Sequence, residues 1–274
     1  MIALHARRSA DSIAAWAKTH PGRGLAVVLT GTDLYRDIQQ DQSAQRSLEL
    51  AQLLVVLQER GADALAAHLR PKARTIFQST TRRAEIQKTG AHLRAIMVGH
   101  LRAVKSPETL FEAAGRLAGE EGIFIDHIGD ALDPELGAAA EATAAACPHY
   151  RWLGGQPHDA VRRRIQRAHV LILTSSMEGG AHVIMEAIAC GTPVLASRVP
   201  GNVGMLGTDY AGYFDHGDAA KLAGLLVRCR DDLSGSRDSL LRRLQAQCAK
   251  RLPLFAPDAE RAAVRNLVKE LLSS

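Results

Sequence analysis

Short apolar runs alternate with segments of helical periodicity along most of the chain. In the first part, apolar runs at 25–29, 53–57 and 74–77 are separated by helical patterns at 43–51 and 61–69. Runs of this length that end in Gly, Pro or small polar residues are typical of buried strands. Because strands that alternate with helices form parallel sheets, the pattern predicts an α/β protein.

The same alternation continues in the second part of the chain. A polar segment at 81–90 indicates a link between two domains, which we expect at 1–92 and 93–252. The predicted strands of the second domain are 93–98, 123–128, 150–153, 170–173, 194–196 and 213–214. The predicted helices are 133–146, 157–167, 181–190, 218–230, 236–250 and 259–272, the last capped by Asp258.

A strand, a glycine turn and a helix follow one another between 170 and 191. The run at 170–173 ends in small polar residues, after which come Glu178, Gly179 and Gly180 and then the helical pattern at 181–190. Gly191 is placed to end that helix in a left-handed turn. Paired glycines let a backbone approach a ligand closely, and a helix N-terminus favours an anion such as phosphate.

Two carboxylates belong to this stretch. Glu178 lies in the turn and Glu186 lies in the helix, with seven residues between them. Glu186 is expected to share a helix face with His182, one turn earlier. A carboxylate at this position can accept both hydroxyls of a ribose. The alternative is a surface Glu on an amphipathic helix and a turn Glu beside glycines.

Composition narrows the function classes without choosing one. The chain is 46% hydrophobic and 4% aromatic, and its formal net charge is +5. Nucleic-acid-binding motifs are not recognised, and no apolar run is long enough to cross a bilayer, so we expect neither nucleic acid nor membrane as a partner. Four cysteines without a C-x-x-C spacing are typical of reduced, buried thiols in a cytoplasmic protein.

Eleven histidines raise the question of a metal site. His182 and Glu186 have the helical i, i+4 spacing of metal ligands, but no third ligand is evident in the sequence. We therefore expect no metal and no cofactor.

The combination of E-x7-E, the glycine pair and EAIACGTPVLAS after a strand resembles the nucleotide-sugar site of retaining GT-B glycosyltransferases, the large family that includes sucrose and trehalose synthases. The resemblance implies two Rossmann-like domains with parallel sheets, the first completed by a C-terminal helix at 257–274. It also implies that Glu178 faces the donor sugar, that the turn amides hold the diphosphate, and that Glu186 holds the ribose.

Further site residues follow from the same resemblance. Arg102 and Lys105 would act with Glu178 in catalysis by neutralising the charge on the leaving UDP. The implied donor-binding residues are Gly99, Trp152, Leu153, Gly179, Gly180, Ala181, His182 and Glu186. The implied acceptor-binding residues are His5, Thr30, Gly31, Thr32, Asp33, Arg36, Gln78 and Ser79.

Each group also has a purely structural interpretation. Arg102 and Lys105 would then be solvated charges at a helix entry, and Trp152 a buried core residue. Thr32 or Asp33 would be the N-cap of a helix, and His5 would belong to a solvated helix start.

Several longer motifs are similar to the selenosugar synthase family of selenoneine biosynthesis. They are TGTDLYRDI at 30–38, VGHLRAVK at 98–105, HIGDALD at 127–133, YRWLGG at 150–155, SSMEGGAHVIMEA at 175–187, GNVGMLG with DY at 201–210 and GYFDHGD at 212–218. This likeness implies a UDP-sugar donor, best UDP-N-acetylglucosamine, and a selenophosphate acceptor. Ordinary members of the larger superfamily tend to have Gly-Phe-Gly where this chain has Gly-Gly-Ala after Glu178, and Ser106 stands where Asp is expected.

The beginning of the chain resembles the middle of a GT-B N-terminal domain, and about 40 residues of such a domain have no counterpart. We expect an exposed sheet edge there and therefore possible self-association, with the oligomeric state left open. Two alternatives also remain open. One is a sugar transferase with a hydroxyl acceptor, and the other is a UDP-sugar-binding protein with little activity.

Overall fold

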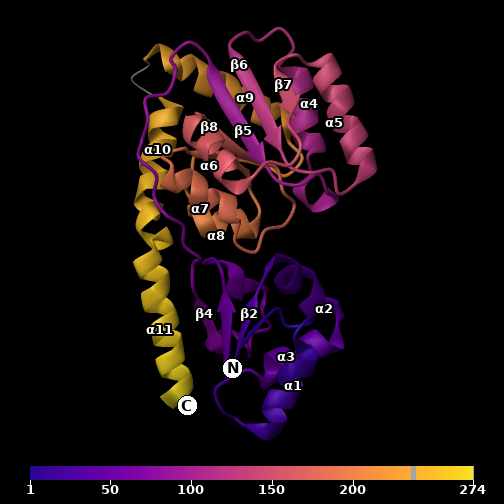
Figure 1. The fold of residues 1–274 in the computed structure, drawn as a ribbon, viewed down its shortest axis with the longest axis vertical. Helices are drawn as coiled ribbons and strands as arrows, with labels where there is room; N and C mark the ends of the chain where they lie inside the picture. The colour runs from indigo at the N-terminus through magenta and orange to yellow at the C-terminus, as the bar shows by residue number, and fades with distance from the viewer. Residues whose placement is uncertain (236–238, 274) are drawn as a thin grey trace.

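The computed structural model describes residues 1–235 and 239–273 and contains two parallel β-sheets, each flanked by helices (Figure 1). Residues 2–75 contribute all strands of the first sheet, and residues 93–214 contribute all strands of the second. The α/β class with two parallel sheets, predicted from the alternation of elements, is confirmed.

The first sheet has the strand order β1-β2-β3-β4, and Val27 in its interior is in register with Ala3 and Leu54. Its strands are β1 (Ile2–Leu4), β2 (Ala26–Leu29), β3 (Leu53–Val56) and β4 (Ala73–Thr75). Its helical elements are α1 (Ala10–Thr19), the π-helix η1 (Asp33–Asp37), α2 (Ile38–Gln40), α3 (Gln42–Leu50) and the 3-10 turns η2 (Gly61–Ala64) and η3 (Arg70–Lys72).

The second sheet has the order β10-β9-β8-β5-β6-β7. Its strands are β5 (Leu93–Val98), β6 (Ile123–Ile128), β7 (Tyr150–Trp152), β8 (Val170–Leu173), β9 (Val194–Ser197) and β10 (Tyr213–Phe214). The helices are α4 (Glu108–Arg116), α5 (Pro134–Ala146), α6 (His158–Arg167), α7 (His182–Ala189), α8 (Pro200–Leu206), α9 (Ala219–Asp231) and α10 (Leu240–Arg251), with 3-10 turns η4 (Ala103–Lys105), η5 (Asp232–Ser234) and η6 (Leu252–Phe255). The carboxyl ends of β5 and β8, the two central strands, carry the loops of the glycine turn and the cations.

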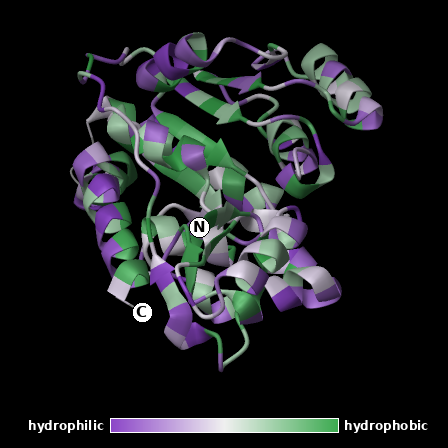
Figure 2. Ribbon diagram, turned by 60° about the horizontal axis from the view of Figure 1, so that its bottom comes forward, coloured by the Kyte–Doolittle hydropathy of each residue, from purple (hydrophilic) through white to green (hydrophobic). Residues whose placement is uncertain are grey.

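Hydrophobic residues gather on the strands and on the helix faces that cover them (Figure 2). β8 and β9 are buried at every position, as is typical of central strands in a parallel sheet covered on both faces. Both strands therefore hold the following loops in fixed positions at the end of the sheet.

The last helix, α11 (Pro257–Ser273), runs beside both parts of the molecule and ends next to the first sheet (Figure 1). Leu267 and Leu271 are buried against Ala26, Leu53 and Val55 of that sheet. Arg74 at the edge of the sheet donates from Nε to Glu270 at 3.0 Å. The helix thus supplies part of the cover of a sheet from which it is distant in sequence.

The chain passes between the two sheets at two places, and these lie side by side. One crossing follows β4, and the other is η6, which leads into α11. The Thr80 amide donates to the Phe255 carbonyl at 3.1 Å, and the rings of Phe77 and Phe255 meet edge to face at 5.5 Å. After the first crossing, the Arg83 amide bonds to the Ala189 carbonyl, so the polar segment at 81–90 lies on the second part of the molecule.

Local signals predicted several boundaries correctly. β5, β6 and β8 have the predicted bounds. Gly191 has φ +67° and ends α7 in the expected left-handed turn. Asp133 caps α5 by accepting from the amides of Glu135 and Leu136.

Other expectations were wrong. The helix predicted at 61–69 is reduced to the 3-10 turn η2, because a segment this short has too few hydrogen bonds to be stable as an α-helix. Asp258 is not a cap, since α11 begins at Pro257, and its carboxylate instead pairs with Arg261 inside the helix. The helix at Pro200–Leu206 was not predicted, and the predicted start of a helix at 236 lies outside the described residues.

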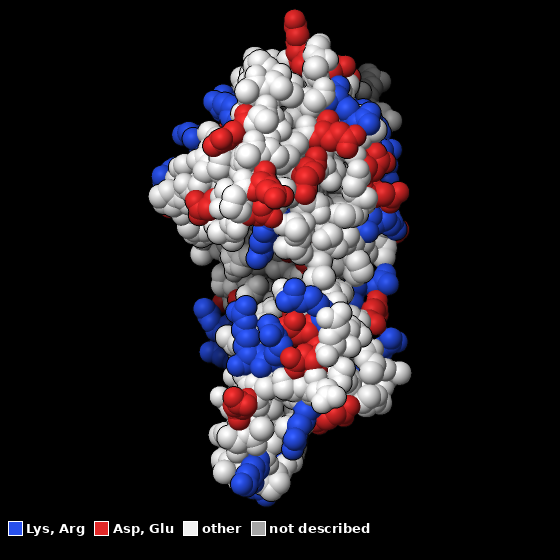
Figure 3. All heavy atoms as spheres, turned by 90° about the vertical axis from the view of Figure 1, so that its right-hand side faces the viewer, with Lys and Arg blue, Asp and Glu red and all other residues white. Residues whose placement is uncertain are grey.

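On the face shown in Figure 3, acidic and basic side chains are interspersed, with several basic groups gathered on the lower part below the waist of the molecule. Within the described residues, every helix is too short or too polar to cross a membrane.

Candidate functional site

A cavity of about 340 Å³ lies where the loops of the two sheets meet. It receives residues that follow β2, β3 and β4 from one side and residues that follow β5 and β8 from the other. These are the carboxyl ends of parallel strands, where ligands of such sheets bind. The lining residues are Thr30, Gly31, Thr32, Leu57, Gln78, Arg102, Val104, Lys105, Met177, Glu178, Gly179 and Gly180.

Glu178 is fixed at the cavity by two donors. The Lys105 ammonium donates to Oε1 at 2.6 Å, and the Ser175 hydroxyl donates to the same oxygen at 2.6 Å. The Glu178 residue is only 9% exposed, so this ion pair is shielded from water and is stronger than a surface pair. Ser175 was not recognised as a site residue, although its spacing of three from Glu178 in a turn is a usable signal.

The two predicted cations are in different situations. Lys105 is already paired with Glu178, whereas Arg102 forms no ion pair with any residue that the structure describes. Arg102 is exposed at the cavity, with its backbone extended before the turn η4. It is therefore the cation most available to an incoming anion.

The glycine turn makes contact with the opposite loop rather than with open space. A Cβ atom on Gly179 would lie 2.2 Å from the amide nitrogen of Gly31, and one on Gly31 would lie 2.8 Å from that of Gly179. A Cβ on Gly180 would lie 2.7 Å from Cβ of Leu57. Close approach of backbones is the reason for these glycines, as predicted, but the partner in this structure is the other half of the protein.

Glu186 is not among the residues that line this cavity. Its Oε1 is 2.5 Å from Nε2 of His158 and 3.5 Å from Nδ1 of His182, which confirms that His182 and Glu186 share a helix face. Burial alone would raise the pKa of Glu186, but the hydrogen bonds from His182 and His158 outweigh it and lower the pKa below its ordinary value. The carboxylate is thus charged and accepts bonds at neutral pH.

His158 was not predicted as part of the site. It begins α6, and its imidazole is 71% exposed, so it can turn away from the buried Glu186 carboxylate. A ligand with two hydroxyls can take its place on that oxygen. Ala181 is the residue before α7 and carries no capping side chain, which leaves the first amides of the helix uncapped by it.

The other donor-side residues are in the framework of the second sheet. Trp152 donates from its indole to the Gly129 carbonyl at 2.8 Å. The Leu153 amide donates to the His127 carbonyl at 2.9 Å, and the Leu153 carbonyl accepts from the Gln156 side chain at 2.8 Å. Gly99 follows β5, where a Cβ on the adjacent Gly129 would be 2.0 Å from the Gly99 carbonyl oxygen.

The predicted acceptor residues do not form one group. Thr30, Gly31, Thr32 and Gln78 line the cavity. The other four lie elsewhere: His5 and Asp33 are buried together, Arg36 is exposed beside Asp37, and Ser79 donates to Glu260 of α11 at 2.5 Å. All four have partners within the protein, and those of His5, Asp33 and Ser79 are remote in sequence.

His5 and Asp33 form a buried cluster with Asp37. Nδ1 of His5 is 3.1 Å from Asp33 and Nε2 is 3.6 Å from Asp37. Burial raises the pKa of Asp33, while Arg7 and Arg36 lower that of Asp37 against the effect of its own burial. The three side chains are close enough to share a metal ion, but the Ala6 amide and Arg7 already satisfy one oxygen of each carboxylate.

The capping role considered for Thr32 and Asp33 is absent from the structure. Thr32 has helical backbone angles and makes no capping bond, and Asp33 is turned inward to the Ala6 amide at 2.8 Å. His5 has φ +74°, which is rare for a residue other than glycine, and it lies in the turn after β1. It is buried and does not belong to a solvated helix start.

Several solved structures share this fold. HepE of Anabaena, solved with UDP, has a TM-score of 0.78 at 16% identity, over 98% of this chain and 78% of its own. The pneumococcal O-GlcNAc transferase GtfA, solved with UDP and GlcNAc, has a TM-score of 0.77 at 16% identity, over 100% of this chain and 57% of its own.

TarM of S. aureus, solved as a variant with fondaparinux, α-GlcNAc-glycerol and UDP, has a TM-score of 0.74 at 12% identity, over 97% of this chain and 55% of its own. The chain thus spans little more than half the length of TarM and GtfA. These likenesses confirm the GT-B fold. The family model "Glycosyl transferases group 1" matches residues 78–229, which is more than half of the sequence. The chain therefore belongs to the glycosyl transferases group 1 family and is a glycosyltransferase.

Proposed function

We propose that this glycosyltransferase transfers the sugar of a UDP-sugar, best UDP-N-acetylglucosamine, to selenophosphate with formation of a carbon–selenium bond. The observation that carries a transfer function is the interdomain cavity, which brings Arg102, Lys105, Glu178 and the glycine turn opposite Thr30, Thr32 and Gln78. The choice of selenophosphate rests on the sequence motifs shared with selenosugar synthases.

A UDP donor is supported by the chemistry of the second domain. Arg102 and the amides of the glycine turn would bind the diphosphate, and the charged Glu186 would accept the two ribose hydroxyls. Trp152 ends β7 and Leu153 follows it, at the place where the base would lie. HepE and GtfA, which have this fold, were solved with UDP.

In the proposed step, a selenium lone pair attacks the anomeric carbon as the bond between that carbon and the UDP oxygen breaks. UDP leaves with the electron pair, so atoms and charges balance without an enzymatic nucleophile. Arg102 and Lys105 stabilise the charge that grows on the diphosphate, and Glu178 orients the sugar through its second oxygen.

Mass spectrometry of the products tests this proposal. The chain is incubated with UDP-N-acetylglucosamine and either selenophosphate or a set of alcohol acceptors. A selenium-containing sugar with release of UDP, lost in Glu178→Gln, is the expected result. Sugar transfer to alcohols alone would favour an ordinary hydroxyl acceptor. UDP binding by calorimetry without turnover of either acceptor would favour a nucleotide-sugar-binding protein.

A further inference from the structure

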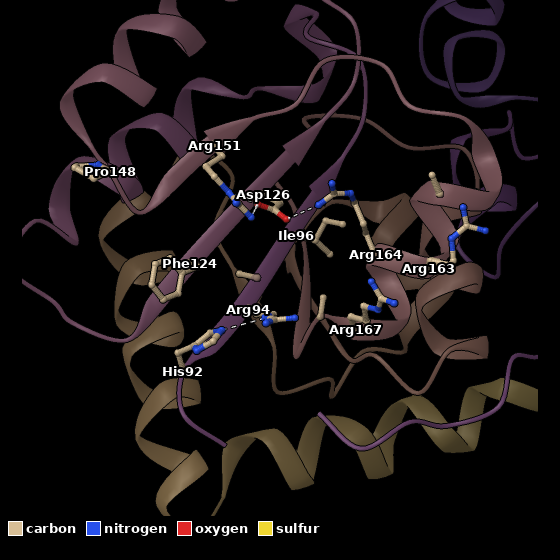
Figure 4. A pocket seen from close by; sticks show the side chains of 13 residues that line it. His92, Arg94, Ile96, Phe124, Asp126, Pro148, Arg151, Arg163, Arg164 and Arg167 are labelled. Carbon is tan, nitrogen blue, oxygen red and sulfur yellow. Dashed lines mark hydrogen bonds and ion pairs between the residues drawn. The ribbon is translucent and has the colours of Figure 1, made fainter. Parts of the chain in front are cut away.

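A second and larger cavity, of about 660 Å³, lies on the second sheet away from the residues of the interdomain site. Its floor is formed by the first residues of β5 and β6 together with β7, and its wall is the last part of α6 (Figure 4). We call it the arginine cavity, after the five arginines among its lining residues, Arg94, Arg151, Arg163, Arg164 and Arg167.

The floor is a face of a parallel sheet that carries charged residues. Ile96, Asp126 and Arg151 are in register across β5, β6 and β7, and Arg94 is in register with Phe124 one step earlier. Parallel sheets usually have both faces covered by helices and apolar side chains. Here Phe124 is 44% exposed, so this part of the sheet is left open to a ligand.

Asp126 holds two of the guanidinium groups in place. Its Oδ1 accepts from Arg151 at 2.6 Å and its Oδ2 accepts from Arg164 at 3.1 Å, and Figure 4 shows both arginines turned toward it from opposite sides. Among the described residues that line the cavity, Asp126 is the one acidic side chain, so it compensates only one of the two charges. Both groups keep further N–H donors and are already ordered, which lowers the entropy cost of binding an anion.

The remaining arginines add to the positive charge. Arg94 donates to the His92 imidazole at 3.0 Å rather than to a carboxylate, and Arg167 forms no ion pair within the part of the chain that the structure describes. Arg163 is paired with Asp159. The cavity therefore has a marked excess of positive over negative side chains at short range, which an anionic ligand would relieve.

An apolar surface borders these charges. The ring of Phe124 lies edge to face with the His92 imidazole, with 5.0 Å between centroids. A flat ring can stack on the exposed part of Phe124 while groups attached to it reach Arg94 and Arg167. The volume lies within the range of small-molecule sites.

We propose that the arginine cavity is a second ligand site, which binds a small organic phosphate with at least two negative charges. The phosphates bond to Arg94, Arg164 and Arg167, and the ring of the ligand lies against Phe124. A nucleoside polyphosphate has both parts. A cavity of this limited volume fits such a molecule better than an extended nucleic acid, whose backbone needs a continuous basic stripe.

Calorimetric titration of the full chain with inorganic triphosphate and with ATP, in about 0.15 M salt, tests the proposal. Both ligands should bind, and Arg94→Ala with Arg167→Ala should weaken both by at least about tenfold, because charge-assisted bonds are lost. Phe124→Ala should weaken ATP and leave triphosphate unchanged. Circular dichroism checks that the variants are folded, as expected for exposed side chains.

Arg116→Ala is the matched control, because Arg116 is an exposed arginine of α4 paired with Glu112, outside the cavity. It should bind both ligands like the parent. The proposal is wrong if triphosphate does not bind, or if its binding is lost in Arg102→Ala but kept in the double variant, since the ligand would then occupy the interdomain cavity. Equal loss of ATP and triphosphate in Phe124→Ala would refute the ring contact.

Discussion

Two imidazoles, those of His158 and His182, face one oxygen of the buried Glu186 carboxylate. If the ribose takes the place of His158, Glu186→Ala removes charged hydrogen bonds that are worth about 1.5–3 kcal/mol each. UDP affinity, measured by calorimetry, should fall by at least tenfold, while 2′,3′-dideoxy-UDP should lose little. His158→Ala is the control that keeps the carboxylate, and it should bind UDP at least as well as the parent. Unchanged UDP affinity in Glu186→Ala would exclude the ribose role.

Arg102 and Lys105 differ in their partners, and so should their variants. Arg102→Ala should weaken UDP more than uridine, because only UDP carries the diphosphate. Lys105→Ala should do the same and should also lower turnover, since it leaves Glu178 buried with an unpaired charge. Binding of UDP and uridine is compared by calorimetry. An equal loss for both ligands would mean that these residues are structural.

His127 is fully buried in the second sheet and bonded to the Tyr150 hydroxyl at 3.0 Å. Burial lowers the pKa of His127 to about 4, whereas a histidine in the unfolded chain has a pKa of about 6.5. Between these two pH values, the imidazole is protonated in the unfolded chain and neutral in the folded chain. The free energy of unfolding should therefore decrease as the pH is lowered through that window. This group alone should contribute a loss of about 2 kcal/mol between pH 7 and pH 5.

Urea unfolding at pH 7 and pH 5 measures this effect. His127→Gln should reduce the loss of stability, whereas His68→Gln, an exposed histidine beside Glu49, should leave it nearly unchanged. The same pH dependence in parent and His127→Gln would show that His127 is not the group responsible.

At the scale of elements, the glycine turn and the loop after β2 lie so close together that neither has room for a side chain at the contact. Gly179→Ala would place Cβ 2.2 Å from the Gly31 amide nitrogen, so one of the two loops must move. Because a displacement on the order of 1 Å can cost about 100-fold in rate, turnover should fall by about that factor. The melting temperature should fall as well.

Gly224→Ala is the matched control for that variant. Gly224 lies in α9, and a Cβ there meets nothing within 4 Å. Replacing a helical glycine with alanine should raise stability by about 0.5–1 kcal/mol and leave turnover unchanged. Parental activity in Gly179→Ala would show that the two loops are free to separate.

Elements with local signals could be predicted from the sequence. β5 and β6 are short apolar runs between turn residues, and Asp133 and Gly191 mark helix ends by their own chemistry. The π-helix η1 and the helix α8 could not be predicted in this way. η1 is stabilised by Asp33 and Asp37 reaching back to residues near His5, and α8 lies against the glycine turn, where a Cβ on Gly201 would be 1.8 Å from the Glu178 carbonyl.

At the scale of the whole molecule, the sequence motifs predicted which loops meet but not which side chains face the cavity. Thr30, Thr32 and Gln78 do line it, whereas Asp33 and Ser79 are taken up by the Ala6 amide and by Glu260. These partners are remote in sequence, so no local pattern indicates them. The arginine cavity was missed for the same reason, since its residues come from three strands and a helix and share no motif.

The two adjacent crossings of the chain have a mechanical consequence. Because the segment after β4 and the turn η6 are bonded to each other through Thr80 and Phe255, we expect them to act as one hinge between the two halves. A protease cut at 81–90 would break one of the two chain connections between the halves and would leave α11 in place. The two fragments should then elute together in gel filtration, because Leu267 and Leu271 still join the second fragment to the first sheet.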